Sequence, residues 1–255
     1  MKKSIVFFIV LVAAAWSIDL FTYCKWEKKD DTPPVDSLTV GLVAYYSFNG
    51  NSFDISGNEN NGLAYNTTAG IDRNGNDNSC YHFDGVSSYV RVPDNKLLRL
   101  SNTDYTINAW VKLDAFSSAF SSAILSKRDG SINLGYYLGI TGTGAAATGS
   151  VGFGPGGTAP GITSTGTISL NKWYMITIVY NVSKQQVTVY KNGIFDSTVS
   201  NISSPGATQP ADIYIGADNP ATGNSYFLKG FLDDIRIYNR RLSSTDITNL
   251  YYSPI

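Results

Sequence analysis

The sequence predicts an all-β protein in which two antiparallel sheets pack as a sandwich, with one short helix near the C-terminus. Three observations support this fold class. The composition favours strands and tight turns, with 24 Gly and 17 Tyr in 255 residues. Several short segments have strand-like apolar patterns, and turn sequences separate them. A helical pattern that begins with a capping signal occurs close to the C-terminus.

The segments that predict strands begin at residue 40. Residues 40–48 are apolar and aromatic, and an Asn-Gly pair follows them. Residues 173–180 are almost continuously apolar, as expected for a strand that is buried on both faces. Strands are also predicted at 213–216 and 231–238. Residues 105–113 alternate, so that one face of a strand carries Tyr105, Ile107, Ala109, Val111 and Leu113.

A hairpin and a helix are predicted from local signals. Asn192-Gly193 separates two strand-like segments, 186–190 and 194–199. A type I′ turn needs positive φ at both central positions, and this pair supplies it readily. The helix is predicted over 244–252. Ser243 caps it, with Asp246 reaching back as in a capping box.

Residues 40–255 are predicted to form a single domain, because the composition stays uniform from residue 40 onward. The segment 139–167 is rich in Gly, Ala, Ser and Thr. It forms either short strands joined by long turns or a loop.

The N-terminus has the features of an export signal. Two lysines precede an apolar run at 5–15, which is shorter than the ~20 residues of a typical membrane-spanning helix. Cleavage after Ala15 would secrete the protein. Alternatively, the site before Cys24 resembles a bacterial lipoprotein box, with signal peptide 1–23 and a lipidated tether at 24–39. We expect an exported lipoprotein of the outer membrane or cell surface, typical of Bacteroidetes-type bacteria; an uncleaved anchor is the third alternative.

The composition excludes several function classes. The formal net charge is −1 and no basic stripe occurs, so nucleic acid is not an expected partner. His82 is the sole histidine, and Glu27 and Glu59 are the only glutamates. A Ser-His-Asp triad would therefore have to use His82, and a pair of catalytic glutamates would have to use both Glu27 and Glu59. The sequence favours a protein that is not an enzyme, and catalysis by Asp or Tyr stays an alternative.

Seven blocks of sequence follow one another along the chain. They are GLVAYYSFNG (41–50) with DISGNENNG (54–62), FDG (83–85) with SYV (88–90), YTINAWV (105–111), ILSK (124–127), WY (173–174) with YKNG (190–193), IG (215–216) and FLDDIRIYNRRLS (231–243). In this order they resemble the LamG-like jelly-roll domains of the concanavalin A-like lectin/glucanase superfamily. The resemblance implies a two-sheet jelly roll with adjacent first and last strands, and a frequent structural calcium ion. Members include carbohydrate-binding modules, adhesive domains and accessory domains of glycosidases, so the fold alone leaves the function open.

A calcium site is predicted from the residues and the resemblance together. The loop 49–62 is dense in oxygen-bearing side chains, and Ca²⁺ binds six to eight oxygens. Strand alternation directs Asp233 to the same face as Ile235 and Ile237, where a buried carboxylate needs a partner. The related glucanases use a similarly placed aspartate for calcium. The predicted ligands are Asp54, Asp233, Asn49 and Asp84; alternatively, the loop is an Asx-rich turn and Asp233 accepts backbone hydrogen bonds.

A glycan site is predicted from two segments that combine aromatic rings with hydrogen-bonding side chains. The residues are Arg128, Asp129, Asn133 and Tyr137 in the first segment, and Asp218, Asn219 and Tyr226 in the second. The predicted function is a non-catalytic module of the cell envelope that binds glycan, with a structural calcium and with membrane contact through the lipid anchor only. A protein-interaction or adhesion domain is the alternative, and an Asp- or Tyr-based glycan-degrading enzyme is the second alternative.

Overall fold

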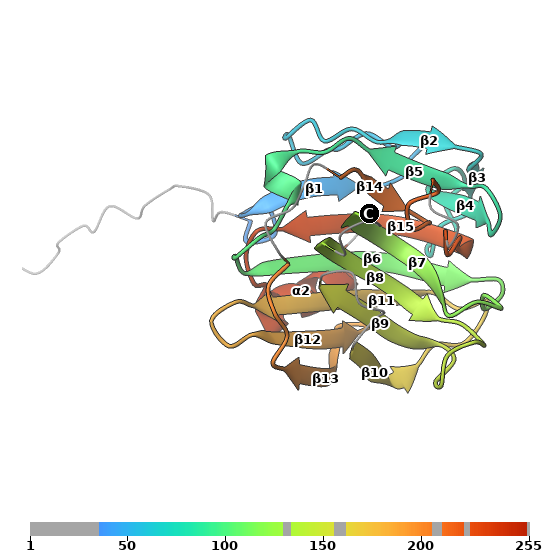
Figure 1. The fold of residues 1–255 in the computed structure, drawn as a ribbon. Coiled ribbons are helices and arrows are strands. Elements are labelled where there is room, and N and C mark those ends of the chain that lie inside the picture. Colours follow the sequence, from blue (N-terminus) through green and yellow to red (C-terminus); the bar gives the residue numbers. More distant parts are fainter. Residues whose placement is uncertain (1–35, 130–133, 156–161, 206–210, 222–224, 254–255) are drawn as a thin grey trace, which may run out of the picture. The chain divides into compact units, whose positions relative to one another are not determined.

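The computed structural model describes residues 36–129, 134–155, 162–205, 211–221 and 225–253. The described strands form two antiparallel sheets, one of eight strands and one of seven (Figure 1). The prediction of a two-sheet sandwich with one short helix is confirmed. The predicted signal peptide and Cys24 lie outside the described residues, as does Asn133.

The order of strands within each sheet defines the two layers. The eight-stranded sheet contains β13 (Ile194–Ser200), β12 (Gln186–Lys191), β11 (Tyr174–Asn181), β6 (Tyr105–Leu113), β15 (Lys229–Tyr238), β4 (Cys80–Asp84) and β3 (Thr68–Gly70), with β1 (Leu42–Tyr46) paired to β15. The seven-stranded sheet contains β10 (Ile162–Thr167), β9 (Ser150–Pro155), β8 (Leu134–Thr141), β7 (Ser121–Asp129), β14 (Ile213–Ile215), β5 (Tyr89–Val92) and β2 (Leu63–Tyr65). The described helical elements are η1 (Lys96–Leu98) and α2 (Ser244–Tyr252).

The last strand, β15, lies at the centre of the eight-stranded sheet. Its second half pairs with β1, where Leu42 lies opposite Tyr238 and Tyr46 lies opposite Ile235. Its first half pairs with β4, and its other edge pairs with β6. The first and last strands are therefore adjacent, as the resemblance implied.

The main hydrophobic core lies between the two sheets. On β6 the predicted alternating residues are buried and belong to this core: Tyr105, Ile107, Ala109, Val111 and Leu113. The seven-stranded sheet contributes Leu138 from β8 and Ile213 and Ile215 from β14. Burying one such aliphatic side chain contributes about 1.5–3 kcal/mol. This layer therefore holds the two sheets together.

Helix α2 covers part of the outer face of the eight-stranded sheet and forms a second, smaller core there. Ile247 and Leu250 pack in one cluster with Trp110 and Met175. The Trp110 ring stacks on Tyr251 of the helix at a centroid distance of 5.5 Å. Strand β11 is consequently buried on both faces, as its continuous apolar sequence predicted.

The predicted caps and turns are present. The Ser243 hydroxyl accepts the Asp246 N–H at 3.0 Å, and the Asp246 carboxylate accepts the Ser243 N–H at 3.1 Å. This capping box contributes about 0.5–2 kcal/mol to the start of α2. Asn192 and Gly193 join β12 to β13 with φ values of 53° and 77°, as a type I′ turn requires. The described part of segment 139–167 folds into strands with turns between them.

Candidate functional site

The predicted glycan-binding side chains meet on the outer face of the seven-stranded sheet. Arg128 lies on β7 and Tyr137 on β8, whereas Asp218 and Tyr226 belong to the segment between β14 and β15. Arg128 forms an ion pair with Asp218. Its guanidinium lies 4.7 Å from the centre of the Tyr137 ring, and the Tyr137 and Tyr226 rings meet edge to face at 6.4 Å. We name these four residues the Arg128 cluster.

The Arg128 cluster is largely closed to solvent. Both chain neighbours of Tyr137 belong to the main core, so its ring points away from that core, yet it is only 1% exposed. Burial raises the pKa of the Tyr137 hydroxyl, which donates a hydrogen bond to Ser121 at 2.8 Å. Asp218 also accepts a hydrogen bond from the Ser126 hydroxyl at 2.5 Å. Because these polar groups bind one another, the cluster anchors the β14–β15 segment to the sheet.

The remaining predicted residues lie around this cluster. The Asn219 N–H donates to the Asp218 carboxylate at 3.0 Å, and its side-chain oxygen accepts the N–H of Ala221 at 3.0 Å. Asp129 ends β7, where its backbone pairs with Leu134. The structure thus brings together all the predicted glycan residues whose side chains it describes.

Three partly exposed tyrosines continue the same face toward β2, and the sequence reasoning missed them. Tyr65 of β2 stacks on Tyr89 of β5 at a centroid distance of 4.7 Å. Tyr89 meets Tyr214 of β14 edge to face at 5.9 Å. Beside these rings, Arg91 Nε lies 2.5 Å from Asp212 Oδ2 in a partly exposed ion pair. We name Tyr65, Tyr89 and Tyr214 the tyrosine row.

Strand register places the tyrosine row beside the Arg128 cluster. Arg91 pairs with Tyr214, Tyr214 with Ser126, and Ser126 with Tyr137, which makes one line across four neighbouring strands. Side chains in such a line share one face of a sheet. Tyr89 and Tyr214 alternate with apolar residues that are buried, and this alternation is the sequence signal that could have identified them as outward-facing. Their proximity was not visible, because it depends on strand order across distant parts of the chain.

The predicted orientation of Asp233 is wrong, because β15 contains a bulge. The register between β15 and β6 shifts after Asp233, and Asp234 has a φ of 47°. An extra residue at a bulge reverses which following side chains face the core. Ile235 and Ile237 belong to the main core, whereas Asp233 lies opposite Trp110, which packs in the outer cluster under α2.

Arg73 is the cation that faces this buried carboxylate. Its guanidinium nitrogens lie 2.7 Å from Asp233 Oδ2 and 2.6 Å from Asp234 Oδ2. The same guanidinium lies 4.3 Å from the centre of the Trp110 ring. Burial and the neighbouring Asp234 raise the pKa of Asp233 to about 8, against the lowering effect of Arg73. Asp233 Oδ1 is buried and has no hydrogen-bond partner among the described residues.

The other predicted calcium ligands are engaged by their own loops or exposed. Asp54 accepts three backbone N–H groups at 2.9 Å, from Tyr45, Ser56 and Asn60. Asp84 accepts the N–H groups of residues 86–88; burial raises its pKa, but these bonds lower it further than burial raises it. Asn49 is exposed. Within the described ranges, no group of three His, Cys, Asp or Glu residues is arranged to hold a metal ion. The predicted ligands do not fit one ion, and calcium binding stays a prediction.

His82 lies on the outer face of the eight-stranded sheet. Its Nε2 lies 2.9 Å from Asp114 Oδ2, and its ring lies 4.6 Å from the Phe231 ring. The Lys112 ammonium lies 4.0 Å from the centre of the Phe231 ring and 5.3 Å from that of Trp173. His82 is thus packed between a carboxylate and an aromatic ring. Such contacts are typical of a histidine with a structural role.

The two sheets and the adjacent first and last strands define a jelly-roll β-sandwich. A family model described as the concanavalin A-like lectin/glucanases superfamily matches residues 84–248, which is more than half of the chain. The chain therefore belongs to this superfamily, and the resemblance found in the sequence is confirmed. A search of curated proteins finds no match.

Several solved structures share the fold. Domain 4 of AbnA, an extracellular GH43 arabinanase from Geobacillus stearothermophilus, was solved in complex with arabinotriose; it is 20% identical with a TM-score of 0.65, over 82% of this chain and 98% of that one. The binding domain of Paraclostridial Mosquitocidal Protein 1 is 20% identical with a TM-score of 0.65, over 84% of this chain and 52% of that one. The binding domain of botulinum neurotoxin DC, solved with rat synaptotagmin II, is 16% identical with a TM-score of 0.62, over 84% of this chain and 52% of that one. At these identities the likeness establishes the fold alone.

Proposed function

We propose that this protein is a non-catalytic module that binds glycans on the outer face of its seven-stranded sheet. The tyrosine row is the observation that carries the proposal. Sugars present apolar C–H faces and hydroxyl groups, and sites for such ligands combine apolar surface with a few placed polar groups. The row supplies rings, of which Tyr65 is 37% exposed, and the Arg91–Asp212 pair supplies charged hydrogen-bonding groups beside them.

The Arg128 cluster supports this platform. It ties the β14–β15 segment to β7 and β8 directly beside Tyr214. A surface binds its ligand more tightly when neighbouring side chains fix its geometry, because less conformational entropy is lost on binding. We therefore assign the Arg128 cluster the part of a rigid border and the tyrosine row the part of the contact surface.

The ligand class is supported by what similar domains bind. The arabinanase domain was solved with arabinotriose. The binding domain of botulinum neurotoxin DC was also solved with SialylT. These ligands belong to those proteins, and the inference to this chain is that the shared fold accommodates glycan recognition on its surface.

A protein partner is the second candidate. The neurotoxin domain in complex with rat synaptotagmin II shows that the fold also supports protein contacts. In this chain Ile194 and Phe195 are 72% and 58% exposed at the start of β13. This strand ends the order of the eight-stranded sheet. Exposed apolar side chains on a sheet edge are suited to contact with another protein.

We also propose that lipid on Cys24 holds the protein at the outer membrane or cell surface. The proposal rests on the N-terminal sequence, where an apolar run precedes the cysteine and a charged, proline-containing tether follows it. Within the ranges that the structure covers, no helix is both long and apolar enough to cross a membrane.

A glycan array tests the proposed function. The purified protein is applied in calcium and, separately, in EDTA. Saturable binding to at least one saccharide is the expected result, and its dependence on EDTA decides whether calcium takes part. A blank array in both solutions would contradict glycan binding and would favour the protein partner.

A further inference from the structure

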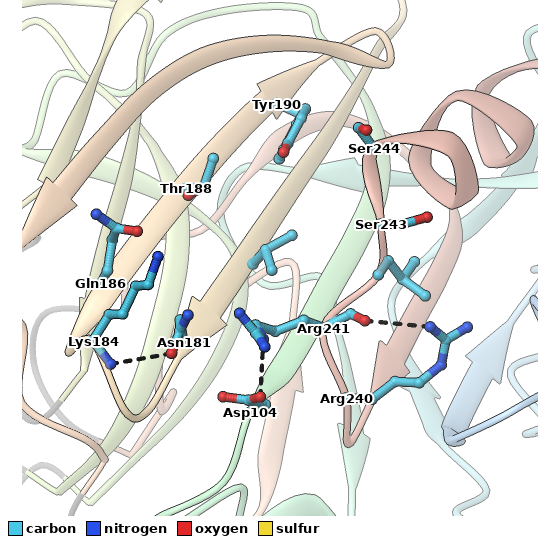
Figure 2. Close-up of a pocket in the computed structure, with 12 residues that line it drawn as sticks. Asp104, Asn181, Lys184, Gln186, Thr188, Tyr190, Arg240, Arg241, Ser243 and Ser244 are labelled. Carbon is cyan, nitrogen blue, oxygen red and sulfur yellow. Dashed lines mark hydrogen bonds and ion pairs between the residues drawn. The ribbon is translucent and has the colours of Figure 1, made fainter.

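A groove of about 580 Å³ lies on the other side of the sandwich, on the outer face of the eight-stranded sheet (Figure 2). Residues of β11 and β12 form one side of it. Residues 240–243, which connect β15 to α2, and Ser244, the first residue of α2, form the other side. The groove is separate from the tyrosine row, which belongs to the opposite sheet.

Most side chains that line the groove are polar; Tyr190 is its aromatic ring, and Val179 and Leu242 are its apolar residues. Gln186, Thr188 and Tyr190 alternate along β12, so their side chains share one face and follow one another at steps of about 7 Å. Asn181 at the end of β11 and Ser243 before α2 face the same space. This arrangement offers hydroxyl and amide groups along an extended line that ends at a phenol ring.

The end of the groove near Asn181 is positively charged. Arg241 Nε lies 2.9 Å from Asp104 Oδ2, and the other oxygen of Asp104 accepts the Val182 N–H at 2.9 Å. Lys184 also lines this end, and Figure 2 shows Asn181 between Lys184 and Arg241. No acidic side chain of the described ranges lies within 4.0 Å of the Lys184 ammonium.

Arg240, the second arginine of the groove, is also paired with a carboxylate. Arg240 Nη1 lies 3.2 Å from Asp246 Oδ2, and its Nε donates to the Val40 carbonyl at 2.7 Å. Each arginine of the groove is therefore matched by a carboxylate, whereas Lys184 is not. The positive potential at the Lys184 end is thus the excess of one cation over the carboxylates.

We propose that this groove is a second ligand site, which binds an acidic saccharide. The carboxylate of the ligand lies between Lys184 and Arg241, and its sugar rings extend along Gln186 and Thr188 toward Tyr190. The inference shares only the ligand class with the proposed function, because it uses other residues on the other sheet.

Calorimetric titration with trigalacturonate tests the site, with its fully methyl-esterified form as the uncharged analogue. We expect the ester to bind at least tenfold more weakly than the acid. Lys184→Gln is expected to weaken binding of the acid about two- to fivefold, as one exposed charge contact contributes little. The double variant Lys184→Gln/Arg241→Gln is expected to weaken it tenfold or more. Lys172→Gln is the matched control, because this exposed lysine lies beyond the opposite end of β11.

Each of four results would overturn the inference. The first is that the ester binds as tightly as the acid. The second is that Lys172→Gln weakens binding of the acid as much as Lys184→Gln does. The third is that inorganic sulfate binds as tightly as trigalacturonate, which would show that the groove recognises an anion alone. Melting temperatures of the variants accompany each titration, because Arg241→Gln also removes the Asp104 pair. If neutral glycans bind on the array while trigalacturonate does not bind, the groove site fails and the proposed function stands.

Discussion

The guanidinium of Arg73 lies 2.7 Å from the carboxylate of Asp233, although 160 residues separate them in sequence. Arg73 belongs to the segment between β3 and β4, so the contact ties that segment to the central strand β15. The side chain of Arg73 is 9% exposed and that of Asp233 is fully buried. A buried carboxylate requires a partner, and here a guanidinium supplies it.

Replacing Arg73 is expected to destabilise the fold strongly. Arg73→Ala removes the guanidinium that contacts both Asp233 and Asp234 and leaves Asp234 with Arg236 at 3.5 Å; removing one partner of a buried pair costs about 3–5 kcal/mol. Chemical denaturation measures this change in the free energy of unfolding. Arg91→Ala is the control, because its pair with Asp212 is partly exposed and contributes at most about 1 kcal/mol. A loss for Arg73→Ala no larger than that for Arg91→Ala would contradict this account.

The stability that Asp233 contributes is expected to fall as the pH rises. Its pKa is raised to about 8 in the folded protein, against about 3.9 for an aspartate in an unfolded chain. Between these values the folded state holds the additional proton, so the free energy of unfolding decreases with increasing pH. Asp233→Asn removes this titration. The stability of the wild type relative to Asp233→Asn should therefore drop between pH 5 and pH 7, by up to about 1.4 kcal/mol per pH unit. Denaturation curves at both pH values check this, and a constant difference would show that the pKa is not raised.

The variant Asp233→Ala distinguishes two roles for Asp233, as the partner of Arg73 or as a calcium ligand. Because Arg73 faces this carboxylate, we expect the substitution to lower the melting temperature by the same amount in calcium and in EDTA. Thermal denaturation of wild type and variant in both solutions measures it. A loss confined to the calcium solution would restore Asp233 as a calcium ligand.

Cys24→Ser is expected to release the protein from membranes, because the thiol that receives the lipid is removed. Fractionation of cells that express the wild type or the variant, followed by immunoblotting, measures the distribution. Continued membrane retention of the variant would indicate an uncleaved N-terminal anchor and would refute lipidation at this residue.

The elements that local signals specify could be predicted from the sequence. Helix α2 begins where Ser243 and Asp246 form a capping box, and β6 alternates because one of its faces meets the core. The turn at Asn192-Gly193 is likewise a local property, since both residues readily adopt positive φ.

The orientation of Asp233 could not be predicted, because it depends on a bulge. The bulge is formed by Asp234 at a φ of 47°, a conformation for which aspartate gives only a weak signal. One inserted residue moves every later side chain to the other face. The alternation that correctly placed Ile235 and Ile237 in the core therefore misplaced Asp233.

The candidate site could be predicted in its parts and not as a whole. The sequence predicts Arg128 and Asp218 in two separate segments, and strand order brings them into an ion pair across 90 residues. Tyr65, Tyr89 and Tyr214 lie on three strands whose adjacency follows from the jelly-roll topology. Single-residue patterns do not contain that information.

The central claim is that the tyrosine row binds glycan, and one comparison of affinities tests it most directly. Calorimetry is performed with the best saccharide from the array on the wild type, on Tyr65→Ala and on Tyr252→Ala. Tyr252 is the matched control because it is a 76% exposed tyrosine on α2. Loss of a stacking ring at the contact surface is expected to weaken binding about tenfold, equal to about 1.4 kcal/mol. The account predicts this loss for Tyr65→Ala and wild-type affinity for Tyr252→Ala; unchanged affinity for Tyr65→Ala would contradict it.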